Sequence, residues 1–118
     1  MSGAVVWVLF FACTFPPLSP VGVTVGEIRS HPEHFLGKEV IIRGRCMGWR
    51  GNCGPPPVTR SDWVLRDRSG CIYVTGTYVP RSLWGEEVIV EGVVEEKDGL
   101  IYIRGRRVIR GERVKKGR

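Results

Sequence analysis

The sequence predicts an all-β fold, a small closed barrel of five strands preceded by a short helix. Short runs of alternating apolar and polar residues recur between turn signals, as half-buried strands do. Single glycines interrupt two of these runs, where a strand can bend sharply. Three consecutive prolines at 55–57 preclude a strand and indicate a long loop after the first one. With 118 residues, the chain can form one domain with a modest core.

The helical segment is expected first, over residues 25–36. Thr24 and Glu27 have the spacing of a capping box, which satisfies backbone donors at the start of a helix. Gly37 follows as a helix stop. The side chains expected to pack inward from this segment are Ile28, Phe35 and Leu36.

The strands follow at residues 39–47, 62–67, 71–76, 87–96 and 100–110. Residues 37–44 (GKEVIIRG) and 85–92 (GEEVIVEG) share a pattern, which indicates two strands that bend at a glycine to close a barrel. Five strands, a preceding helix and a long loop after the first strand fit the OB architecture, with a β-sandwich or an SH3-like barrel as alternatives. The expected core residues are Trp63, Leu65, Ile72, Val74, Val88, Val90, Ile101 and Ile103.

Residues 1–21 are set apart from this domain as an apolar leader with a proline-rich linker. The run at 4–15 (AVVWVLFFACTF) would reach about 18 Å as a helix, short of the roughly 30 Å hydrocarbon core of a membrane. Three interpretations stay open: an uncleaved membrane anchor, a cleaved or lipidated export signal, and an apolar extension or misplaced start. We expect membrane association through residues 4–15, with cytoplasmic and exported locations as alternatives.

Positive charge is concentrated at the C-terminal end. Eight of the 18 basic residues lie within 104–118 beside one acidic residue, Glu112. This segment therefore has a net charge of +7 and the rest of the chain has −1, which together give the total of +6. A neutral body with a basic end indicates attraction to a polyanion, either single-stranded nucleic acid or anionic lipid, and a solvated tail that only aids solubility is the alternative. The basic tail proper is expected at 111–118, after the barrel domain at 22–110.

The four cysteines are Cys13, Cys46, Cys53 and Cys71. Three of them lie in the domain, and an odd number does not specify a disulfide framework. A bond between Cys46 and Cys53 would close a short loop in an oxidising compartment, and buried free thiols are the alternative. A zinc site with His31 and His34 is disfavoured because there is no Cys-x-x-Cys pair, so we expect neither a metal nor a cofactor.

The segment at 61–74 (SDWVLRDRSGCIYV) resembles the second- and third-strand signature of nucleic-acid-binding OB folds: an aromatic residue, then Leu-x-Asp-x-Ser/Thr-Gly-x-Ile-x-Val. Residues 25–44 resemble the start of small prokaryotic, in particular archaeal, OB-fold proteins of the anticodon-binding-like group. The matching positions are Val25, Glu27, Ile28, Pro32, Gly37, Lys38, Val40, Ile42 and Gly44. The resemblance implies an OB barrel that binds nucleic acid, although the connector at 77–85 is too short for the usual full helix and the turn at 95–98 is acidic.

Strand parity predicts an outward surface of aromatic and basic side chains, which stack bases and hold phosphates. The residues expected on this nucleic-acid-binding surface are Trp49, Arg50, Arg60, Arg66, Tyr73, Tyr102, Arg104 and Arg106. No nucleophile with an orienting partner and no phosphate-binding glycine loop is recognisable, so an enzyme is not expected. The sequence therefore predicts a module that binds single-stranded nucleic acid with weak sequence preference. The alternative is a membrane-anchored or extracytoplasmic OB domain that binds a protein or a small ligand.

Overall fold

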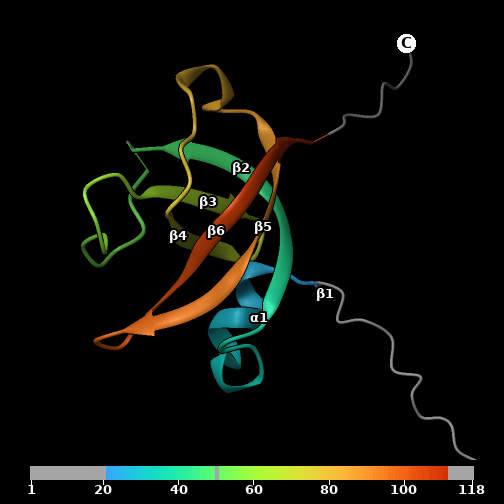
Figure 1. The fold of residues 1–118 in the computed structure, drawn as a ribbon, viewed down its shortest axis with the longest axis vertical. Coiled ribbons are helices and arrows are strands. Elements are labelled where there is room, and N and C mark those ends of the chain that lie inside the picture. The colour runs from blue at the N-terminus through green and yellow to red at the C-terminus, as the bar shows by residue number, and fades with distance from the viewer. Residues whose placement is uncertain (1–20, 50, 112–118) are drawn as a thin grey trace, which may run out of the picture.

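The computed structural model describes residues 21–49 and 51–111, which form a closed five-stranded barrel (Figure 1). Its strands are β2 (Glu39–Gly48), β3 (Trp63–Asp67), β4 (Gly70–Thr75), β5 (Glu87–Lys97) and β6 (Leu100–Arg110). Neighbouring strands are antiparallel except β4 and β6, and the pairing of β5 with β2 closes the barrel. A two-residue strand, β1 (Val21–Gly22), pairs in parallel with β2. The predicted fold class is confirmed.

One short helix, α1 (Val25–Ser30), precedes the barrel and lies at its lower end in Figure 1. Thr24 and Glu27 form both hydrogen bonds of the predicted capping box. The helix is shorter than expected because the chain continues after Ser30 as a separate 3₁₀ turn, Pro32–His34. Leu36 is exposed rather than packed inward, because it follows that turn and joins β5 only through a bridge to Val94.

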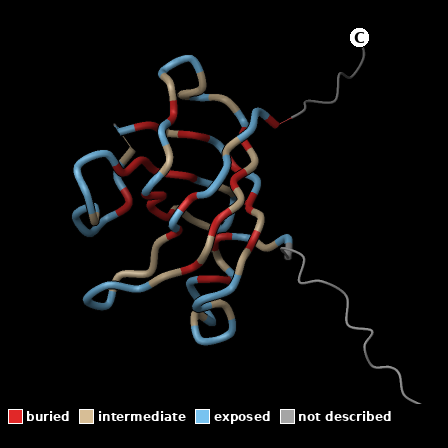
Figure 2. Tube along the Cα trace, viewed as in Figure 1, coloured by how far each residue is buried: buried red, intermediate tan, exposed pale blue. Residues whose placement is uncertain are grey.

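The barrel interior is filled by aliphatic side chains around one tryptophan. Figure 2 shows the buried positions recurring along the strands of the barrel. Trp63 is 2% exposed and its indole N–H donates to the carbonyl of Thr77 at 3.1 Å. All the predicted core residues are buried except Ile101, which is half-buried near the turn of the β5–β6 hairpin and still packs against the core. Alternation along the strands therefore identified the inward face correctly, and seven of the eight side chains are fully within the core.

Two buried glycines mark the points where the barrel wall bends. A Cβ on Gly44 would lie 2.8 Å from the carbonyl oxygen of Arg66, and a Cβ on Gly92 would lie 2.6 Å from that of Arg104. The register also shifts between Glu91 and Gly92, as in a β-bulge. The two strands that share the Gly-x-Glu-Val-Ile-x-x-Gly pattern thus use their last glycine in the same way, for close approach to a neighbouring strand.

The apolar leader and the basic tail lie outside the described residues, apart from Val21 and Gly111. Within 21–49 and 51–111, no helix is long and apolar enough to cross a membrane.

Candidate functional site

The outer face of β3 and β4, where the sequence places a stacking surface, is covered by the long loop at 49–62. Tyr73 is 6% exposed, and its hydroxyl donates to the carbonyl of Pro55 at 2.6 Å. It packs with Cys53 and Val64 in a small second core beneath the loop. The prediction that Tyr73 faces solvent is therefore wrong: its side chain points out of the barrel, but the loop folds back over it.

A disulfide fixes this loop to the barrel wall. It joins Cys53 in the loop to Cys71 on β4, whose Cα atoms lie 5.8 Å apart. The Cys46–Cys53 bond, one of the two possibilities for these cysteines, is wrong, because Cys46 faces the barrel core as a buried free thiol. Burial raises the pKa of the Cys46 thiol, which opposes formation of the reactive thiolate.

The far end of the loop contains Asp62, the one acidic residue that is buried among the described residues. Its carboxylate accepts hydrogen bonds from the backbone N–H of Val58 at 2.6 Å and of Thr59 at 2.9 Å, and another from the Thr59 hydroxyl. The loop is thus anchored at Cys53, Pro55 and Asp62.

The arginines of β6 are matched by glutamates on β5, on β2 and at the end of the β4–β5 connector. Glu95 accepts from Arg104 Nε at 2.7 Å and from the Tyr102 hydroxyl at 3.0 Å. The hydrogen bond from Arg104 lowers the pKa of Glu95, and the pKa of Arg104 is raised by the same bond. Burial and the bond to Glu95 together raise the pKa of Tyr102. Further ion pairs join Arg106 to Glu39, Arg107 to Glu91 and Arg110 to Glu86.

Four arginines instead gather around a hollow on the outside of β2 and β3. The arginine hollow, as we call it, has a volume of about 730 Å³ and is lined by Arg43, Arg45, Arg66 and Arg68 with Thr24, Gly44, Asp67, Ser69 and Glu87. Arg45 and Arg66 are directly paired across the two antiparallel strands, so two like charges face solvent side by side. Such pairs destabilise a sheet.

The negative charges near the arginine hollow are already engaged. Glu87 pairs with Arg43 at 3.1 Å. Asp67 accepts from Ser69, from Gly70 N and from Val25 N, and these bonds outweigh its partial burial and lower its pKa. Within the described part of the chain, no acidic group lies within ion-pair distance of Arg66 or Arg68. The hollow therefore holds unneutralised positive charge.

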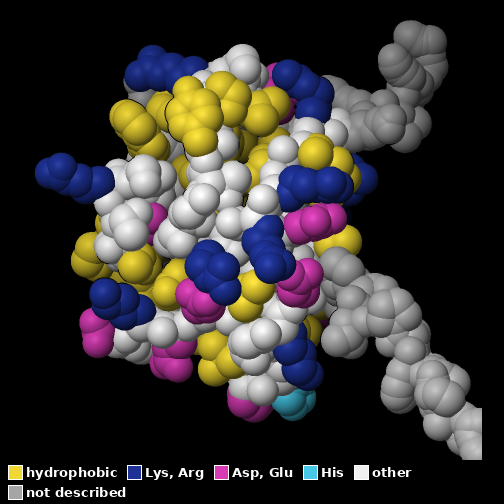
Figure 3. Space-filling view, viewed as in Figure 1, with side chains coloured by type: hydrophobic (Ala, Val, Ile, Leu, Met, Phe, Trp, Pro, Cys, Tyr) yellow, Lys and Arg dark blue, Asp and Glu magenta, His cyan; other side chains and the backbone are white. Residues whose placement is uncertain are grey.

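A second hollow, about 390 Å³ in volume, lies where β2 ends and the connector between β4 and β5 crosses. This aromatic hollow is lined by Trp49, Trp63, Tyr78 and Trp84 with Ser61, Gly76, Thr77 and Val79. The Trp49 and Trp84 ring centroids are 5.8 Å apart, and the Arg81 guanidinium lies 5.1 Å from the centre of the Trp84 ring. Figure 3 shows hydrophobic side chains gathered at this end of the molecule, over the connector.

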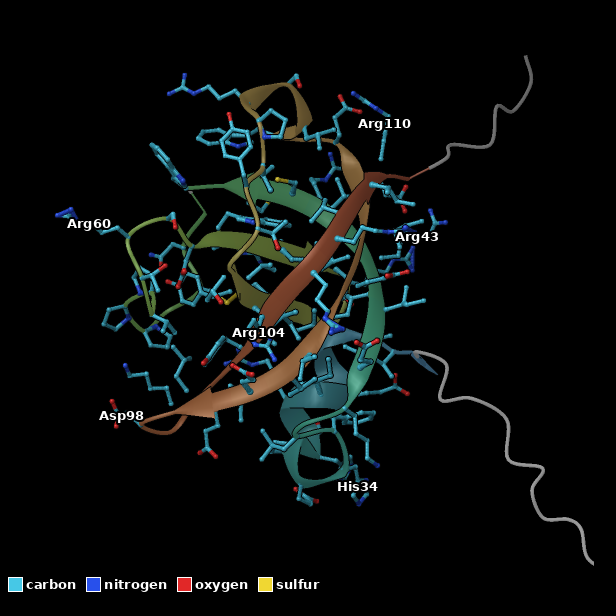
Figure 4. All side chains as sticks on the ribbon, viewed as in Figure 1. His34, Arg43, Arg60, Asp98, Arg104 and Arg110 are labelled. Atoms are coloured by element: carbon cyan, nitrogen blue, oxygen red, sulfur yellow. A yellow bond between two sulfur atoms is a disulfide. The ribbon has the colours of Figure 1, made fainter. Side chains whose placement is uncertain are left out.

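The predicted surface is thus divided among several regions. Trp49 lines the aromatic hollow and Arg66 the arginine hollow, whereas Tyr102, Arg104 and Arg106 form ion-paired or hydrogen-bonded sets on β6. Arg60 is exposed on the loop and points away from the barrel (Figure 4). Arg50 lies outside the described residues.

Sequence reasoning missed most of both hollows. The residues it did not select are Arg43, Arg45, Arg68, Tyr78, Arg81 and Trp84. A signal was present in each case. Arg43 and Arg45 alternate on the polar face of a strand, and the connector TYVPRSLWG carries two aromatic residues and an arginine within nine positions.

One group of side chains has the composition of a metal site. His31, Glu33 and His34 lie on the 3₁₀ turn with their ligand atoms within 4.8 Å of one another, and all three are exposed. The two imidazole rings stack with centroids 5.3 Å apart. The group lies below α1, at the other end of the molecule from the aromatic hollow (Figure 4).

Several solved structures share the fold. The hypothetical protein YgiW from E. coli matches 79% of this chain and 98% of its own, with 16% identity and a TM-score of 0.53. A chain assigned as an aspartyl-tRNA synthetase from Leishmania major Friedlin matches 87% of this chain and 22% of its own, with 19% identity and a TM-score of 0.53. The telomere capping protein Ten1 from Saccharomyces pombe gives a TM-score of 0.48 at 14% identity over 78% of this chain and 81% of its own, and no conclusion rests on it.

No family model and no curated protein matches the chain. At the identities of the structural neighbours, the similarity shows the fold alone, an OB-type barrel, and this chain spans about a fifth of the synthetase-like one. Any function has to be argued from the site.

Proposed function

We propose that this OB barrel binds single-stranded nucleic acid with weak sequence preference, through the arginine hollow. The observation that carries the proposal is the like-charge pair of Arg45 and Arg66 on adjacent strands, with Arg68 beside it. Two like charges on directly paired residues repel each other, and a bound polyanion removes that cost. Phosphate suits them because each planar guanidinium can donate two parallel hydrogen bonds.

The weak sequence preference follows from the composition of the hollow. Arginine contacts to phosphates position a strand but carry little sequence information. OB barrels commonly bind oligonucleotides, and one structural neighbour is named for its action on tRNA. Because a fold hosts many functions, these similarities support the proposal less than the unneutralised arginines do.

The test is the binding of a fluorescently labelled single-stranded oligonucleotide, measured by anisotropy over a range of salt concentrations. Arg45→Glu combined with Arg66→Glu should weaken binding by about tenfold or more at low salt. If each residue contacts one phosphate, the slope of log affinity against log salt should become less steep by about 1.4. The matched control, Arg107→Glu with Arg110→Glu, changes the net charge equally at arginines that already have glutamate partners. Equal losses in both double variants would show nonspecific charge attraction and contradict the proposed site.

A second candidate function is favoured by the disulfide. Disulfides persist in oxidising compartments, so Cys53–Cys71 supports an exported or membrane-anchored module that binds a protein or a small ligand there. Cell fractionation, combined with protease access to the domain in intact cells, tests this location. A domain found wholly in the cytoplasm would remove this candidate. Association with anionic lipid through the tail and with membranes through residues 4–15 stays a prediction, which vesicle binding can test.

A further inference from the structure

We propose that the aromatic hollow holds one unpaired base of a bound single strand. The inference rests on the proposed function and extends it. It assigns the place where one base of the bound strand stacks on aromatic side chains while the phosphates contact the arginine hollow. Four observations carry it: exposed aromatic rings, an unpartnered indole N–H, an adjacent cation, and a hydrogen-bonded link to Arg45 of the arginine hollow.

The rings at the rim are more exposed than packing requires. Trp49 is 64% exposed and Tyr78 is 83% exposed, although both are large and largely apolar. They border a hollow whose floor includes the buried Trp63. Large aromatic side chains at the edge of a concave surface offer flat faces for another ring, and every base has such a face.

Trp84, which lines the hollow, also carries a buried polar group without a partner. The indole Nε1 of Trp84 is buried and has no hydrogen-bond partner among the described residues. An unsatisfied buried donor costs free energy that an acceptor can recover. Ring nitrogens and carbonyl oxygens on the edge of a base are acceptors of this kind.

The charge beside the hollow selects the class of ligand. The Arg81 guanidinium lies over the Trp84 ring and already makes the cation–π contact that a cationic ligand would seek. A further cation would be repelled, whereas the phosphate next to a stacked base would be attracted. This combination favours a nucleotide over a quaternary ammonium or a lysine side chain.

The two hollows have no lining residue in common, but a hydrogen bond links Arg45 of one to the residue that follows Trp84 of the other. Arg45 donates to the carbonyl of Gly85 at 2.8 Å, and Gly85 follows Trp84 in the chain. The Trp84 ring in turn packs against Gly48 of β2, where a Cβ would lie only 2.3 Å from it. A strand with a phosphate on Arg45 would therefore have a neighbouring nucleotide close to Trp84, at the aromatic hollow.

The experiment compares two oligonucleotides of about twelve residues with the same number of phosphates, one of oligothymidine and one of abasic sugar–phosphate. The full chain should bind the abasic strand roughly 5- to 100-fold more weakly, with an unchanged salt slope, because stacking is lost and charge contacts remain. Tyr78→Ala should bind oligothymidine more weakly by a similar factor and should bind the abasic strand as the original chain does. Tyr78→Phe should keep the original affinity for oligothymidine, since the ring does the stacking. Tyr78 is exposed enough that either change should leave the fold intact.

The outcomes separate the two proposals. Equal affinity for both strands, combined with a loss in the Arg45/Arg66 double variant, would overturn the base subsite and leave the arginine hollow in place. Absence of binding to either strand at low salt would overturn both. Loss of oligothymidine binding in Tyr78→Phe as large as in Tyr78→Ala would also overturn the subsite, because the phenyl ring keeps the stacking face.

Discussion

Trp63 combines two roles at the residue scale, since it fills the barrel and ties down a connector. Its ring is 2% exposed, and its N–H holds the carbonyl of Thr77 at the start of the β4–β5 connector. Trp63→Ala should therefore lower the free energy of unfolding by about 3–5 kcal/mol, from the cavity and the lost contacts. Chemical denaturation followed by circular dichroism measures this directly. Tyr78→Ala, at an exposed aromatic, is the control and should stay within about 0.5 kcal/mol of the original.

Asp67 predicts a pH dependence. Partial burial would raise its pKa, but hydrogen bonds from Ser69, Val25 N and Gly70 N outweigh this and lower it. A carboxyl whose pKa is lowered by folding stabilises the folded state above its unfolded pKa, and this contribution is lost as pH falls through the folded value. The free energy of unfolding should thus decline below about pH 4, and Asp67→Asn should flatten that decline. An identical acid profile for the variant would show that other carboxyls dominate.

Tyr73 shows why residue-scale predictions of the site failed where those of the core succeeded. Alternation along a strand decides which way a side chain points, and it placed Tyr73 outside the barrel correctly. Whether that outer face is exposed to solvent depends on where a loop distant in the sequence folds. Pairing of Cys53 with Cys71 and the bond from Tyr73 to Pro55 are contacts between segments that no local pattern encodes.

At the scale of elements, the loop at 49–62 should depend on its disulfide. The bond spans 18 residues, and a crosslink of this length stabilises by about 3 kcal/mol, chiefly by restricting the unfolded chain. Peptide mapping without reduction should find Cys53 linked to Cys71, and Cys46→Ala should keep that link. Reduction should lower the free energy of unfolding by about this amount and expose Tyr73, which should then react with a tyrosine-modifying reagent, as peptide mapping can show. A peptide linking Cys46 to Cys53 would contradict the structure.

The bends in β2 and β5 give a second prediction at this scale. Gly44→Ala and Gly92→Ala place a methyl group against backbone carbonyl oxygens at 2.8 and 2.6 Å, so a strand has to shift. Each should destabilise the barrel by about 1–3 kcal/mol, as overpacking does. Gly22→Ala is the matched control, because a Cβ there meets nothing within 4 Å. Thermal unfolding of the three variants distinguishes close approach from a general intolerance of alanine.

At the scale of the whole molecule, the fold could be predicted because the sequence patterns that specify it are local and recur along the chain. Alternation, a capping box and glycines in matching positions all agree with one closed barrel. The distribution of charge could not be predicted in this way. Arg104, Arg106 and Arg107 look like part of a basic tail in the sequence, yet in the barrel each meets a glutamate from another strand. Arg66 and Arg68, on β3 and just after it, have no acidic partner within ion-pair distance among the described residues.

That redistribution changes what the tail is expected to contribute to binding. Residues 112–118 carry Arg113, Lys115, Lys116 and Arg118, and the barrel arginines before them are already paired. Gly111 is buried and donates to the Glu87 carbonyl, so a truncation should keep it and remove only 112–118. If the tail adds up to four phosphate contacts, its removal should make the slope of log affinity against log salt less steep by up to about 2.8 on single strands.

The truncated barrel should still discriminate oligothymidine from the abasic strand, because that preference belongs to the aromatic hollow. Binding to anionic vesicles, measured in parallel, should fall with the same truncation if the tail acts on any polyanion. Unchanged salt slopes for both oligonucleotides and vesicles would leave the tail without a part in binding and assign the affinity to the barrel.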